Sequence, residues 1–440
     1  MAGLLRLCTA GSVDDGKSTL IGRLWVDSRA VYDDQVRAVT AASKQRTAGP
    51  LDYSLFTDGL KAEREQGITI DVAHRYFATP RRKFILADTP GHEQYTRNMV
   101  TGASTADVAI LLVDARHGVT PQTERHARIA RLLGLRHLVL AVNKMDLVGF
   151  DESAFTRICE ACHEWMSGTD AYAIPISALY GDNVISHSPR TPWFDGQSLL
   201  EYLEAVDVDH DVTAKPFRFP VQLILRPDDQ FRGYAGQIVS GTIRVGDPIV
   251  VWPAGRVSTV HRVVTRDGDL DVAHAPMSVT LVLEDALDIS RGDLLAGAQA
   301  FRANAQPVTG TMFDAEMVWM DERPLDPSRV YLLKHTTRTV TAEVDHALLL
   351  NQIGSVTLST ARPIVFDRYA DNRTTGSFIL IDPSTNFTAG AGMIADTVRD
   401  AATRSAKPSA AERLARLART APSDAEAIEA VRRVLEDLLT

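Results

Sequence analysis

Two patterns of apolar residues alternate in the first part of the chain. Runs that are apolar almost throughout are typical of strands buried on both faces, as in a parallel sheet. Segments with apolar residues three and four positions apart, such as 19–25 and 155–166, predict amphipathic helices. Together these patterns predict an α/β domain with a mostly parallel sheet at residues 1–212. The strands expected within it are 4–10, 74–78, 83–87, 108–113, 137–142 and 173–176.

The pattern changes near residue 213, where short strands follow one another at close spacing. The pairs Gly246-Asp247 and Gly292-Asp293 are turn residues between such strands. Two series of this kind predict two small antiparallel β-barrels, at 213–302 and 303–400. The expected strands are 219–225, 236–241, 249–252 and 279–283 in the first barrel, and 311–319, 330–333, 340–344 and 378–381 in the second.

The last forty or so residues return to helical spacing. Ser409-x-x-Glu412 and Ser423-x-x-Glu426 are two capping boxes, and each precedes apolar residues at helical intervals. They predict a C-terminal helical hairpin at 401–440, joined around Pro422. Two roles remain open for it: packing on its own barrel, or docking a partner or a second copy of the chain.

Composition narrows the class of protein. A chain of 440 residues is expected to form about three domains, and its 45% hydrophobic and 23% charged residues are ordinary for a soluble protein. No apolar run approaches the ~20 residues of a membrane span. Met1 leads straight into the first strand, so we expect no signal peptide and a cytoplasmic location. The three cysteines do not form a disulfide framework, and a net charge of −9 disfavours nucleic acid as the main partner.

The loop after the first strand carries the clearest chemistry. It fits the phosphate-binding pattern G-x-x-x-x-G-K-[ST] and lies between a predicted strand and a predicted helix. Its glycines allow backbone N–H groups to approach phosphate oxygens, and the helix presents its positive end to the same anion. Lys17 is expected to reach the β and γ phosphates, and Ser18 to hold Mg²⁺. The expected contact residues are Gly11, Ser12, Val13, Asp14, Asp15, Gly16, Lys17, Ser18 and Thr19.

A second group of candidate residues follows the strand 83–87. Asp88 stands at the end of this strand, where a further Mg²⁺ contact is expected beside a phosphate loop. Gly91 offers a backbone N–H to the γ phosphate, and His92 can orient or polarise an attacking water. The alternative for Asp88-Thr89-Pro90-Gly91 is an ordinary β-turn.

A long irregular stretch at 28–64 leads to Thr69. A loop of this length inside a compact domain is usually functional or mobile. A Thr at its end can give its hydroxyl to Mg²⁺ and its N–H to the γ phosphate, so that the loop orders with a triphosphate. The alternative is an ordinary strand residue.

Two further loops identify the base of the nucleotide. Asn143-Lys144-Met145-Asp146 and Ser177-Ala178-Leu179 each follow a predicted strand and match the guanine-reading loops of GTPases. The Asp146 carboxylate can accept hydrogen bonds from N1–H and the 2-amino group of guanine, and the Ala178 N–H can contact O6. Adenine would leave these polar groups unpaired, which a buried site penalises. The four loops in this order predict a GTP site.

Cys159-x-x-Cys162-His163 fits the pattern of covalent haem attachment or half of a zinc site. However, both cysteines fall on the apolar stripe of a predicted helix, and the chain has no second cysteine pair. We therefore interpret them as helix core residues. Asp367, Arg368 and Tyr369 are also conspicuous, and we interpret them as a strand-end ion pair.

On these motifs the chain resembles the translation-factor class of GTPases, and more closely the large subunit of bacterial heterodimeric sulfate adenylyltransferase. Translation factors usually carry histidines at the positions of Ser12 and Asp15. The sulfate-activating subunit has Ser and Asp there, as this chain does. The resemblance covers about 4–396. It rests on the phosphate loop and on the segments 62–71, 88–99, 231–236 and 289–293.

The resemblance implies roles for several residues. Ser18 and Thr69 would share Mg²⁺, with Asp88 in its second coordination sphere. His92 would position the water behind an apolar gate from Val13 and Ile68, and Asp14 would shape the phosphate loop.

It also implies a division of labour between two chains. This chain would hydrolyse GTP, and a small subunit of the ATP-pyrophosphatase type would make adenylyl sulfate, in a heterodimer or a higher oligomer. No second phosphate loop occurs, so the adenylylsulfate kinase fused to some relatives is not expected. Three alternatives stay open: a translation elongation-type GTPase, a GTP-switched scaffold with little turnover, and a paralogue serving a specialised sulfation pathway.

Overall fold

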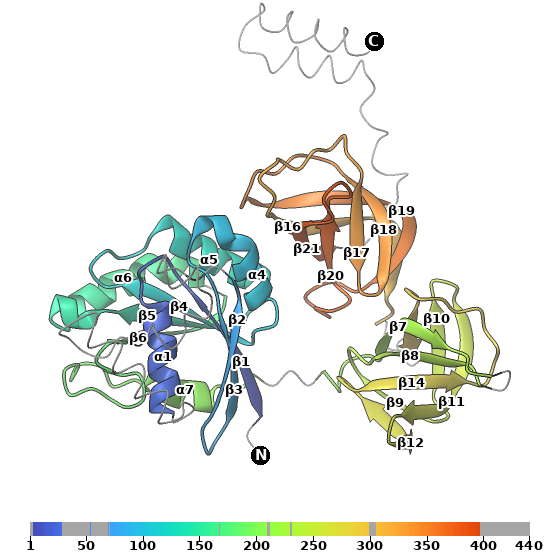
Figure 1. The fold of residues 1–440 in the computed structure, drawn as a ribbon, viewed down its shortest axis with the longest axis horizontal. Coiled ribbons are helices and arrows are strands. Elements are labelled where there is room, and N and C mark those ends of the chain that lie inside the picture. Colours follow the sequence, from blue (N-terminus) through green and yellow to red (C-terminus); the bar gives the residue numbers. More distant parts are fainter. Residues whose placement is uncertain are drawn as a thin grey trace, which may run out of the picture.

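The computed structural model describes residues 3–28, 53, 69, 71–166, 168–208, 212–228, 231–298 and 305–396. Figure 1 shows three units in chain order: an α/β domain that mixes helices and strands, and two units built from strands. The helical hairpin expected at 401–440 lies outside the described residues. Among the described helices, none combines the length and the apolar character that crossing a membrane requires.

The α/β domain is built on a six-stranded sheet with the strand order β2-β3-β1-β4-β5-β6. Only the edge strand β2 runs antiparallel to its neighbour, and the other pairings are parallel. The mostly parallel sheet predicted from the apolar runs is therefore confirmed. The strands are β1 Leu4–Ala10, β2 Ala73–Ala78, β3 Lys83–Asp88, β4 Val108–Asp114, β5 His137–Asn143 and β6 Asp170–Pro175.

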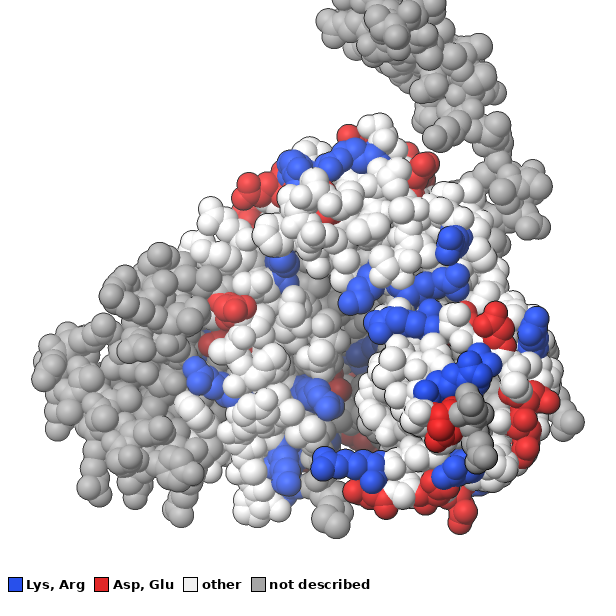
Figure 2. All heavy atoms as spheres, turned by 45° about the vertical axis from the view of Figure 1, so that its right-hand side comes forward, with Lys and Arg blue, Asp and Glu red and all other residues white. Residues whose placement is uncertain are grey.

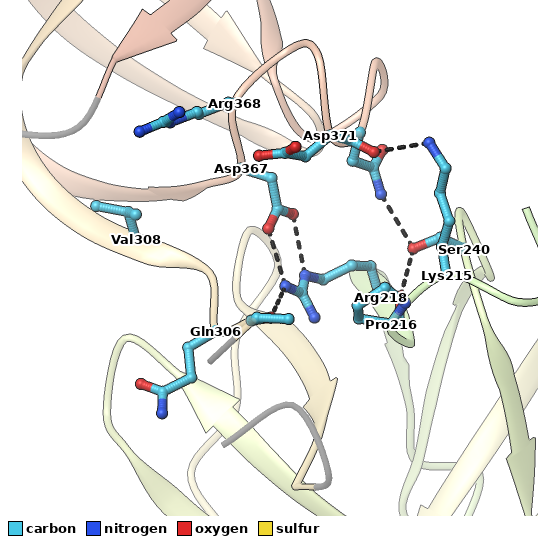
Figure 3. Close-up of a pocket in the computed structure, with 11 residues that line it drawn as sticks. Lys215, Pro216, Arg218, Ser240, Gln306, Val308, Asp367, Arg368 and Asp371 are labelled. Atoms are coloured by element: carbon cyan, nitrogen blue, oxygen red, sulfur yellow. Dashed lines mark hydrogen bonds and ion pairs between the residues drawn. The ribbon is translucent and has the colours of Figure 1, made fainter. Parts of the chain in front are cut away.

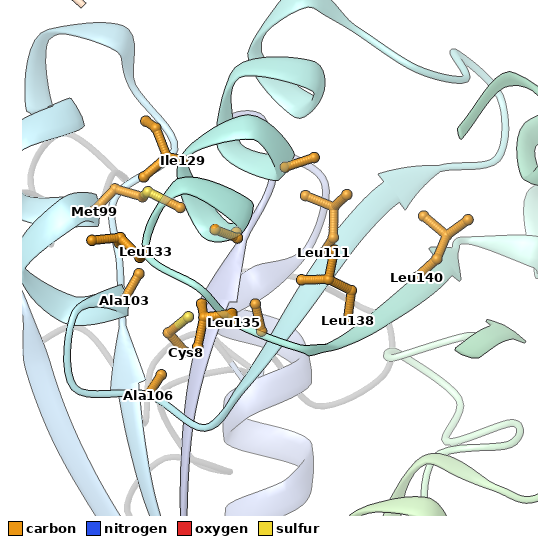
Figure 4. Close-up of a cluster of buried hydrophobic side chains, with 14 of the residues drawn as sticks. Cys8, Met99, Ala103, Ala106, Leu111, Ile129, Leu133, Leu135, Leu138 and Leu140 are labelled. Carbon is orange, nitrogen blue, oxygen red and sulfur yellow. The ribbon is translucent and has the colours of Figure 1, made fainter. Parts of the chain in front are cut away.

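Helices cover both faces of this sheet. On one face, Met99, Ile129 and Leu133 pack over Leu111 and Leu138 of the central strands (Figure 4). The opposite face has a separate core formed with α1 and α7. The helices are α1 Lys17–Asp27, α4 Thr96–Ala103, α5 Pro121–Leu132, α6 Glu152–Met166 and α7 Leu199–Ala205, with 3-10 turns η2 Glu93–Tyr95 and η3 Met145–Val148. The functional loops predicted after β1, β3, β5 and β6 leave the sheet at one edge, because they follow the carboxyl ends of parallel strands.

The second unit is an antiparallel sheet that closes on itself. Its strand order is β10-β15-β7-β8-β14-β11-β12, and an additional pairing of β10 with β11 completes the ring. The expected strand 236–241 is only partly correct: the strand ends at Gln237, and Gly241 (φ 81°) turns the chain away. The strands of this sheet are β7 Arg218–Leu225, β8 Gly233–Gln237, β10 Pro248–Trp252, β11 Arg256–Thr265, β12 Gly268–Leu270, β14 Ser278–Leu283 and β15 Leu294–Gly297. A separate two-stranded sheet consists of β9 Thr242–Arg244 and β13 Val272–His274.

The third unit is a closed barrel of six strands in the order β16-β19-β18-β17-β20-β21, in which β16 also pairs with β21. Both predicted barrels are therefore present as closed antiparallel sheets. The strands are β16 Val308–Trp319, β17 Tyr331–His335, β18 Arg338–Val344, β19 Ile353–Phe366, β20 Ser377–Ile381 and β21 Thr388–Asp396.

The last barrel contacts both other units through specific side chains. The Asn351 amide donates to the carbonyl of Glu93 at 3.2 Å, and the Tyr369 hydroxyl donates to the carbonyl of Leu133 at 2.8 Å. The second contact lies just past the end of α5. Toward the other barrel, the buried Arg218 guanidinium pairs with Asp367 at 2.8 Å. Of the three residues interpreted as a strand-end ion pair, Asp367 forms one; its partner is Arg218, so the pair joins the two barrels.

Candidate functional site

The loop after β1 adopts a backbone that requires glycine at two positions. Gly11 and Gly16 have φ values of 137° and 94°, a region that disfavours other residues. A Cβ on Gly11 would lie 2.6 Å from the carbonyl oxygen of Leu112, and one on Gly16 would lie 2.4 Å from the Asn143 amide nitrogen. Asp14 also has a positive φ, 64°, at the exposed tip of the loop. The predicted phosphate-binding loop therefore has its close-approach backbone, wedged between β4 and the loop that follows β5.

Charged side chains hold the inside of this loop. The Asp15 carboxylate accepts the N–H of Ser12 at 2.6 Å, and the Lys17 ammonium donates to the carbonyls of Gly11 and Ser12 at 3.1 and 2.6 Å. Burial lowers the pKa of Lys17, while the nearby carboxylates of Asp15 and Asp88 oppose that shift. Burial also raises the pKa of Asp15. The Lys17 side chain is thus buried at the loop, where a low local dielectric strengthens its attraction to phosphate oxygens.

The segment after β3 packs directly against the same loop. Asp88 is almost fully buried, and the Thr89 hydroxyl donates to the carbonyl of Thr9 on β1. A Cβ on Gly91 would lie 2.3 Å from the Lys17 ammonium nitrogen and 2.9 Å from the backbone of Ser12. Gly91 therefore packs directly on the phosphate loop, with no room for a side chain between it and Lys17. A β-turn alone would not require this contact.

His92 follows directly and precedes the short helix η2. Its ring is half-buried and lies 6.3 Å from the ring of Tyr95, between centroids. Its buried Nδ1 atom has no hydrogen-bond partner among the described residues. The next residue is held on two sides: the Glu93 carboxylate pairs with Arg125 at 2.8 Å, and its carbonyl accepts from Asn351. His92 is thus an available imidazole beside the phosphate loop, on a segment that is fixed from α5 and from the last barrel.

The two predicted base-reading loops meet through one side chain. The Asn143 amide donates to the carbonyl of Asp15 at 2.8 Å, and its oxygen accepts the N–H of Ala178 at 2.9 Å. The Ser177 hydroxyl donates to one oxygen of the Asp146 carboxylate at 2.6 Å. This bond orients Asp146 and leaves its second oxygen to accept from a base. Asn143 thus ties the phosphate loop to both loops that were predicted to recognise guanine.

Lys144 and Leu179 complete the connections among these loops. Lys144 has a positive φ of 61°, and its ammonium binds the Asp114 carboxylate at 2.9 Å and the carbonyl of Asp14. The carbonyls of Ala178 and Leu179 accept from the guanidinium of Arg23 on α1. Long cationic side chains therefore hold the backbone of the phosphate loop and of the loop that contains Ala178 and Leu179.

The residues predicted to hold Mg²⁺ are of the right chemical type. Ser18 and Thr69 offer hydroxyl oxygens, and Asp88 offers a buried carboxylate; hard cations such as Mg²⁺ prefer oxygen ligands. Ser18 and Thr19 are half-buried in the first turn of α1, directly after Lys17. Val13, half of the predicted apolar gate, is half-buried in the phosphate loop, whereas Ile68 lies outside the described residues.

Sequence reasoning missed the support that α5 gives to the phosphate loop. The Nδ1 atom of His126 accepts the N–H of Gly11 at 3.0 Å, and the Ser12 and Thr120 hydroxyls lie 2.5 Å apart. His126 is fully buried, and burial, aided by the charge of Lys17, lowers its pKa to about 3. It is therefore neutral and able to accept a hydrogen bond. The available signal was a polar residue beside the apolar positions Ala127, Ile129 and Ala130, which share the buried face of α5.

The Cys-x-x-Cys-His segment lies in a helix, and among the described residues it belongs to no cluster of three or more side chains that could hold a metal. Cys159 and Cys162 lie in α6, where Cys162 is fully buried in the helix-covered core. Burial raises the pKa of the Cys159 thiol to about 11 and that of Cys162 to about 12, so both stay protonated at neutral pH. The prediction that these cysteines are helix core residues is confirmed.

Comparisons with known proteins place these loops in context. The model of the elongation factor Tu GTP-binding domain matches residues 3–210, and the GTP-eEF1A C-terminal domain-like model matches 345–395. Sulfate adenylyltransferase subunit 1 of Bacteroides fragilis is 52% identical over 90% of this chain and 86% of its own length. The subunit 1 of Alteromonas mediterranea is 49% identical over 90% of this chain and 87% of its own. The bifunctional enzyme CysN/CysC of Mycobacterium tuberculosis is longer: it is 51% identical over 93% of this chain and 69% of its own length.

Proposed function

Because this chain belongs to the family of sulfate adenylyltransferase subunit 1, with an elongation factor Tu-type GTP-binding domain, we propose that it hydrolyses GTP to drive adenylyl sulfate formation. In one reaction GTP and water give GDP and phosphate. In the other, ATP and sulfate give adenylyl sulfate and diphosphate. Relatives of about 50% identity that carry the sulfate adenylyltransferase name favour this function over a translation factor or a scaffold.

The observation that carries the proposal is the contact of Asn143 with both Asp15 and Ala178. It fixes the distance between the loop that binds phosphates and the loops that read the base. Asp146 would then accept from N1–H and the 2-amino group of guanine, and the Ala178 N–H, which donates to Asn143 in this structure, would be shared with O6. Because adenine offers neither the amino group nor an acceptor there, the site selects GTP.

The phosphates would be bound by the loop amides, by Lys17 and by Gly91. Ser18 and Thr69 would hold Mg²⁺, with Asp88 acting through a water in its second coordination sphere. When bound, Mg²⁺ neutralises charge that develops on the β and γ phosphates. The close packing of Gly91 on Lys17 supports this arrangement, because the Gly91 N–H reaches the γ phosphate only if no side chain intervenes. Asp14 at the exposed tip and Asp15, whose carboxylate accepts the N–H of Ser12, would maintain the shape of the loop.

Hydrolysis requires a water placed in line with the γ phosphate. We assign this role to His92, whose ring nitrogen is not engaged by another described residue and whose backbone adjoins Gly91. Val13 lies on the phosphate-loop side and would restrict the access of His92 until the site is triggered. Charge neutralisation by Lys17 and Mg²⁺, together with a positioned water, is the usual basis of phosphoryl transfer to water.

Adenylyl transfer would take place on a partner subunit. The chain contains one nucleotide site of identifiable type, and its base-reading loops select guanine rather than adenine. Formation of a sulfate–phosphate anhydride is uphill, so GTP hydrolysis can drive it only through a conformational link between the two subunits. The small subunit is expected to be of the ATP-pyrophosphatase type, in a cytoplasmic heterodimer or a higher oligomer.

The test of this function is an assay with both subunits present. The chain is co-purified with a candidate small subunit, and adenylyl sulfate formation from ATP and sulfate is measured with and without GTP. We expect product to accumulate in step with GTP hydrolysis. A stable complex whose adenylyl sulfate yield does not respond to GTP would contradict the proposal.

A further inference from the structure

A groove rich in positive charge runs along the junction of the three units. It consists of two adjoining cavities of about 600 and 620 Å³, which share Lys215, Ser240 and Asn372 in their linings. In Figure 2, Lys and Arg side chains gather in the hollow between the units. We call it the junction groove. Its size is that of a small-molecule site.

The charges of the junction groove contrast with those of the whole protein. Six basic side chains and two acidic ones line the two cavities among the described residues, an excess of four positive charges, whereas the chain carries −9. The cavity of about 600 Å³ has four of the basic residues and no acidic one among its described lining. The basic residues of the groove are Arg131, Arg136, Lys215, Arg218, Arg368 and Arg373.

The excess of four positive charges already counts both carboxylates of the groove, Asp367 and Asp371. Figure 3 shows Asp367 engaged on both oxygens by the buried Arg218, which consumes one charge of each sign. Lys215 donates to the backbone carbonyl of Asp371 at 2.7 Å. Lys215 therefore keeps its full charge at the point where the two cavities meet.

Two arginines of the α/β domain are open to a ligand. Arg131 lies in the last turn of α5 and Arg136 lies just before β5, and both side chains are exposed. Neither forms an ion pair or a side-chain hydrogen bond with a described residue. The carbonyls at the end of α5, Leu133 and Gly134, are already bound by Tyr369 and Arg373. The negative end of the helix thus does not compete for these two guanidinium groups.

We propose that the junction groove binds a small anion with two linked phosphate-type groups, either free pyrophosphate or the same group on a nucleotide. Arginine recognises such groups through paired N–H donors, and several arginines around one cavity favour a multiply charged anion over a single sulfate. Such a ligand would contact Arg131 and Arg136 on one unit and Lys215 and Arg373 on the others, and so would connect all three. The proposal rests on the groove alone and does not need the proposed function.

Binding is measured by calorimetry with the full chain saturated with GDP and Mg²⁺, so that the phosphate loop is occupied. Inorganic pyrophosphate and ATP are titrated separately to distinguish the two sources of the anion, with sulfate as a single-anion control. We expect at least one of them to bind more tightly than sulfate. Arg131→Gln and Arg136→Gln each remove one charge-assisted contact. Each substitution should therefore weaken that binding about tenfold.

Arg128→Gln is the matched control, because Arg128 is exposed on the same helix but lines neither cavity. It should leave binding unchanged, and the GDP affinity should be the same in all variants. Lys215→Gln gives an independent second test from the other side of the groove. Absence of pyrophosphate and ATP binding to the GDP-loaded protein would overturn the proposal. Pyrophosphate or ATP binding that Arg131→Gln, Arg136→Gln and Lys215→Gln leave unaltered would also overturn it. The same holds if a short RNA binds and neither small anion does.

Discussion

The side-chain oxygen of Asn143 accepts the backbone N–H of Ala178 at 2.9 Å and so joins the ends of β5 and β6. The amide of the same side chain holds the carbonyl of Asp15 in the phosphate loop at 2.8 Å. One buried residue therefore sets both the base-reading and the phosphate-binding halves of the site. Asn143 should therefore affect nucleotide affinity mainly by holding these loops together, rather than through a direct contact with the nucleotide.

Replacing Asn143 with Ala removes both hydrogen bonds and leaves buried polar groups unpaired. Loss of two such bonds should raise the dissociation constants of GTP and GDP about 10–100-fold, because each bond contributes roughly 1 kcal/mol. Fluorescent GDP titration measures the effect. Asn386→Gly, at an exposed turn of the last barrel, is the control. Equal affinities in the Asn143→Ala and wild-type proteins would refute the linking role.

Replacing Gly91 with Ala should separate GTP from GDP. The new Cβ would lie 2.3 Å from the Lys17 ammonium nitrogen, so the segment must move away from the γ phosphate position. We expect GDP affinity to change little and GTP hydrolysis to fall on the order of 100-fold, as for loss of one transition-state donor. Gly3→Ala adds a Cβ with no atom within 4 Å and should have no effect. A Gly91→Ala protein with normal hydrolysis would rule out the proposed contact.

Replacing His92 with Ala tests the positioning of water. GTP binding should remain within about threefold, and hydrolysis measured by phosphate release should fall roughly 10²–10⁴-fold, the usual range for a group of this kind. His117→Ala is a suitable control, since its side chain is 68% exposed. If hydrolysis by the His92→Ala protein, measured with its partner present, equals that of wild type, another residue positions the water.

The buried His126 should make the α/β domain sensitive to acid. Burial, with the charge of Lys17, lowers its pKa to about 3, below the value of ~6.5 expected in the unfolded chain. Between these values the unfolded state binds a proton that the folded state does not. The free energy of unfolding should therefore decrease as the pH drops below about 6.5, by up to about 1 kcal/mol per pH unit.

Urea unfolding at pH 7.5, 6.5 and 5.5 measures this dependence. In His126→Asn, an amide oxygen can accept the Gly11 N–H without titrating, so the loss of stability between pH 6.5 and 5.5 should be smaller than in wild type. The same slope in both proteins would show that other groups cause the acid sensitivity.

Local sequence patterns contain much of this architecture. Apolar runs identify the buried strands β1, β4 and β5, because residues inside a parallel sheet contact helices on both faces. The loops at their ends follow from motif spacing, and the structure brings Lys17, Gly91, Asn143 and Ala178 together at one edge of the sheet. Such features depend on neighbours in sequence, so they can be predicted.

Other features depend on partners far along the chain. The strand β21 is rich in Gly and Ala and has a weak strand pattern; a Cβ on Gly392 would lie 2.1 Å from the Phe378 ring, so the glycine makes room for that ring. The contacts of His126 with Gly11 and of Asn351 with Glu93 link residues 115 and 258 positions apart. No local periodicity encodes such pairings.

The most direct test of the central claim exchanges the nucleotide that drives the reaction. Asp146→Asn replaces an acceptor with an amide, which should disfavour the 2-amino group of guanine and favour the 2-oxo group of xanthine. The assay measures adenylyl sulfate formation by the variant with its small subunit, supplied with either GTP or xanthosine triphosphate. We expect xanthosine triphosphate to support synthesis and GTP to lose most of its effect. If GTP continues to drive the variant as well as wild type, or if xanthosine triphosphate is hydrolysed without any gain in adenylyl sulfate, this nucleotide site does not power the synthesis.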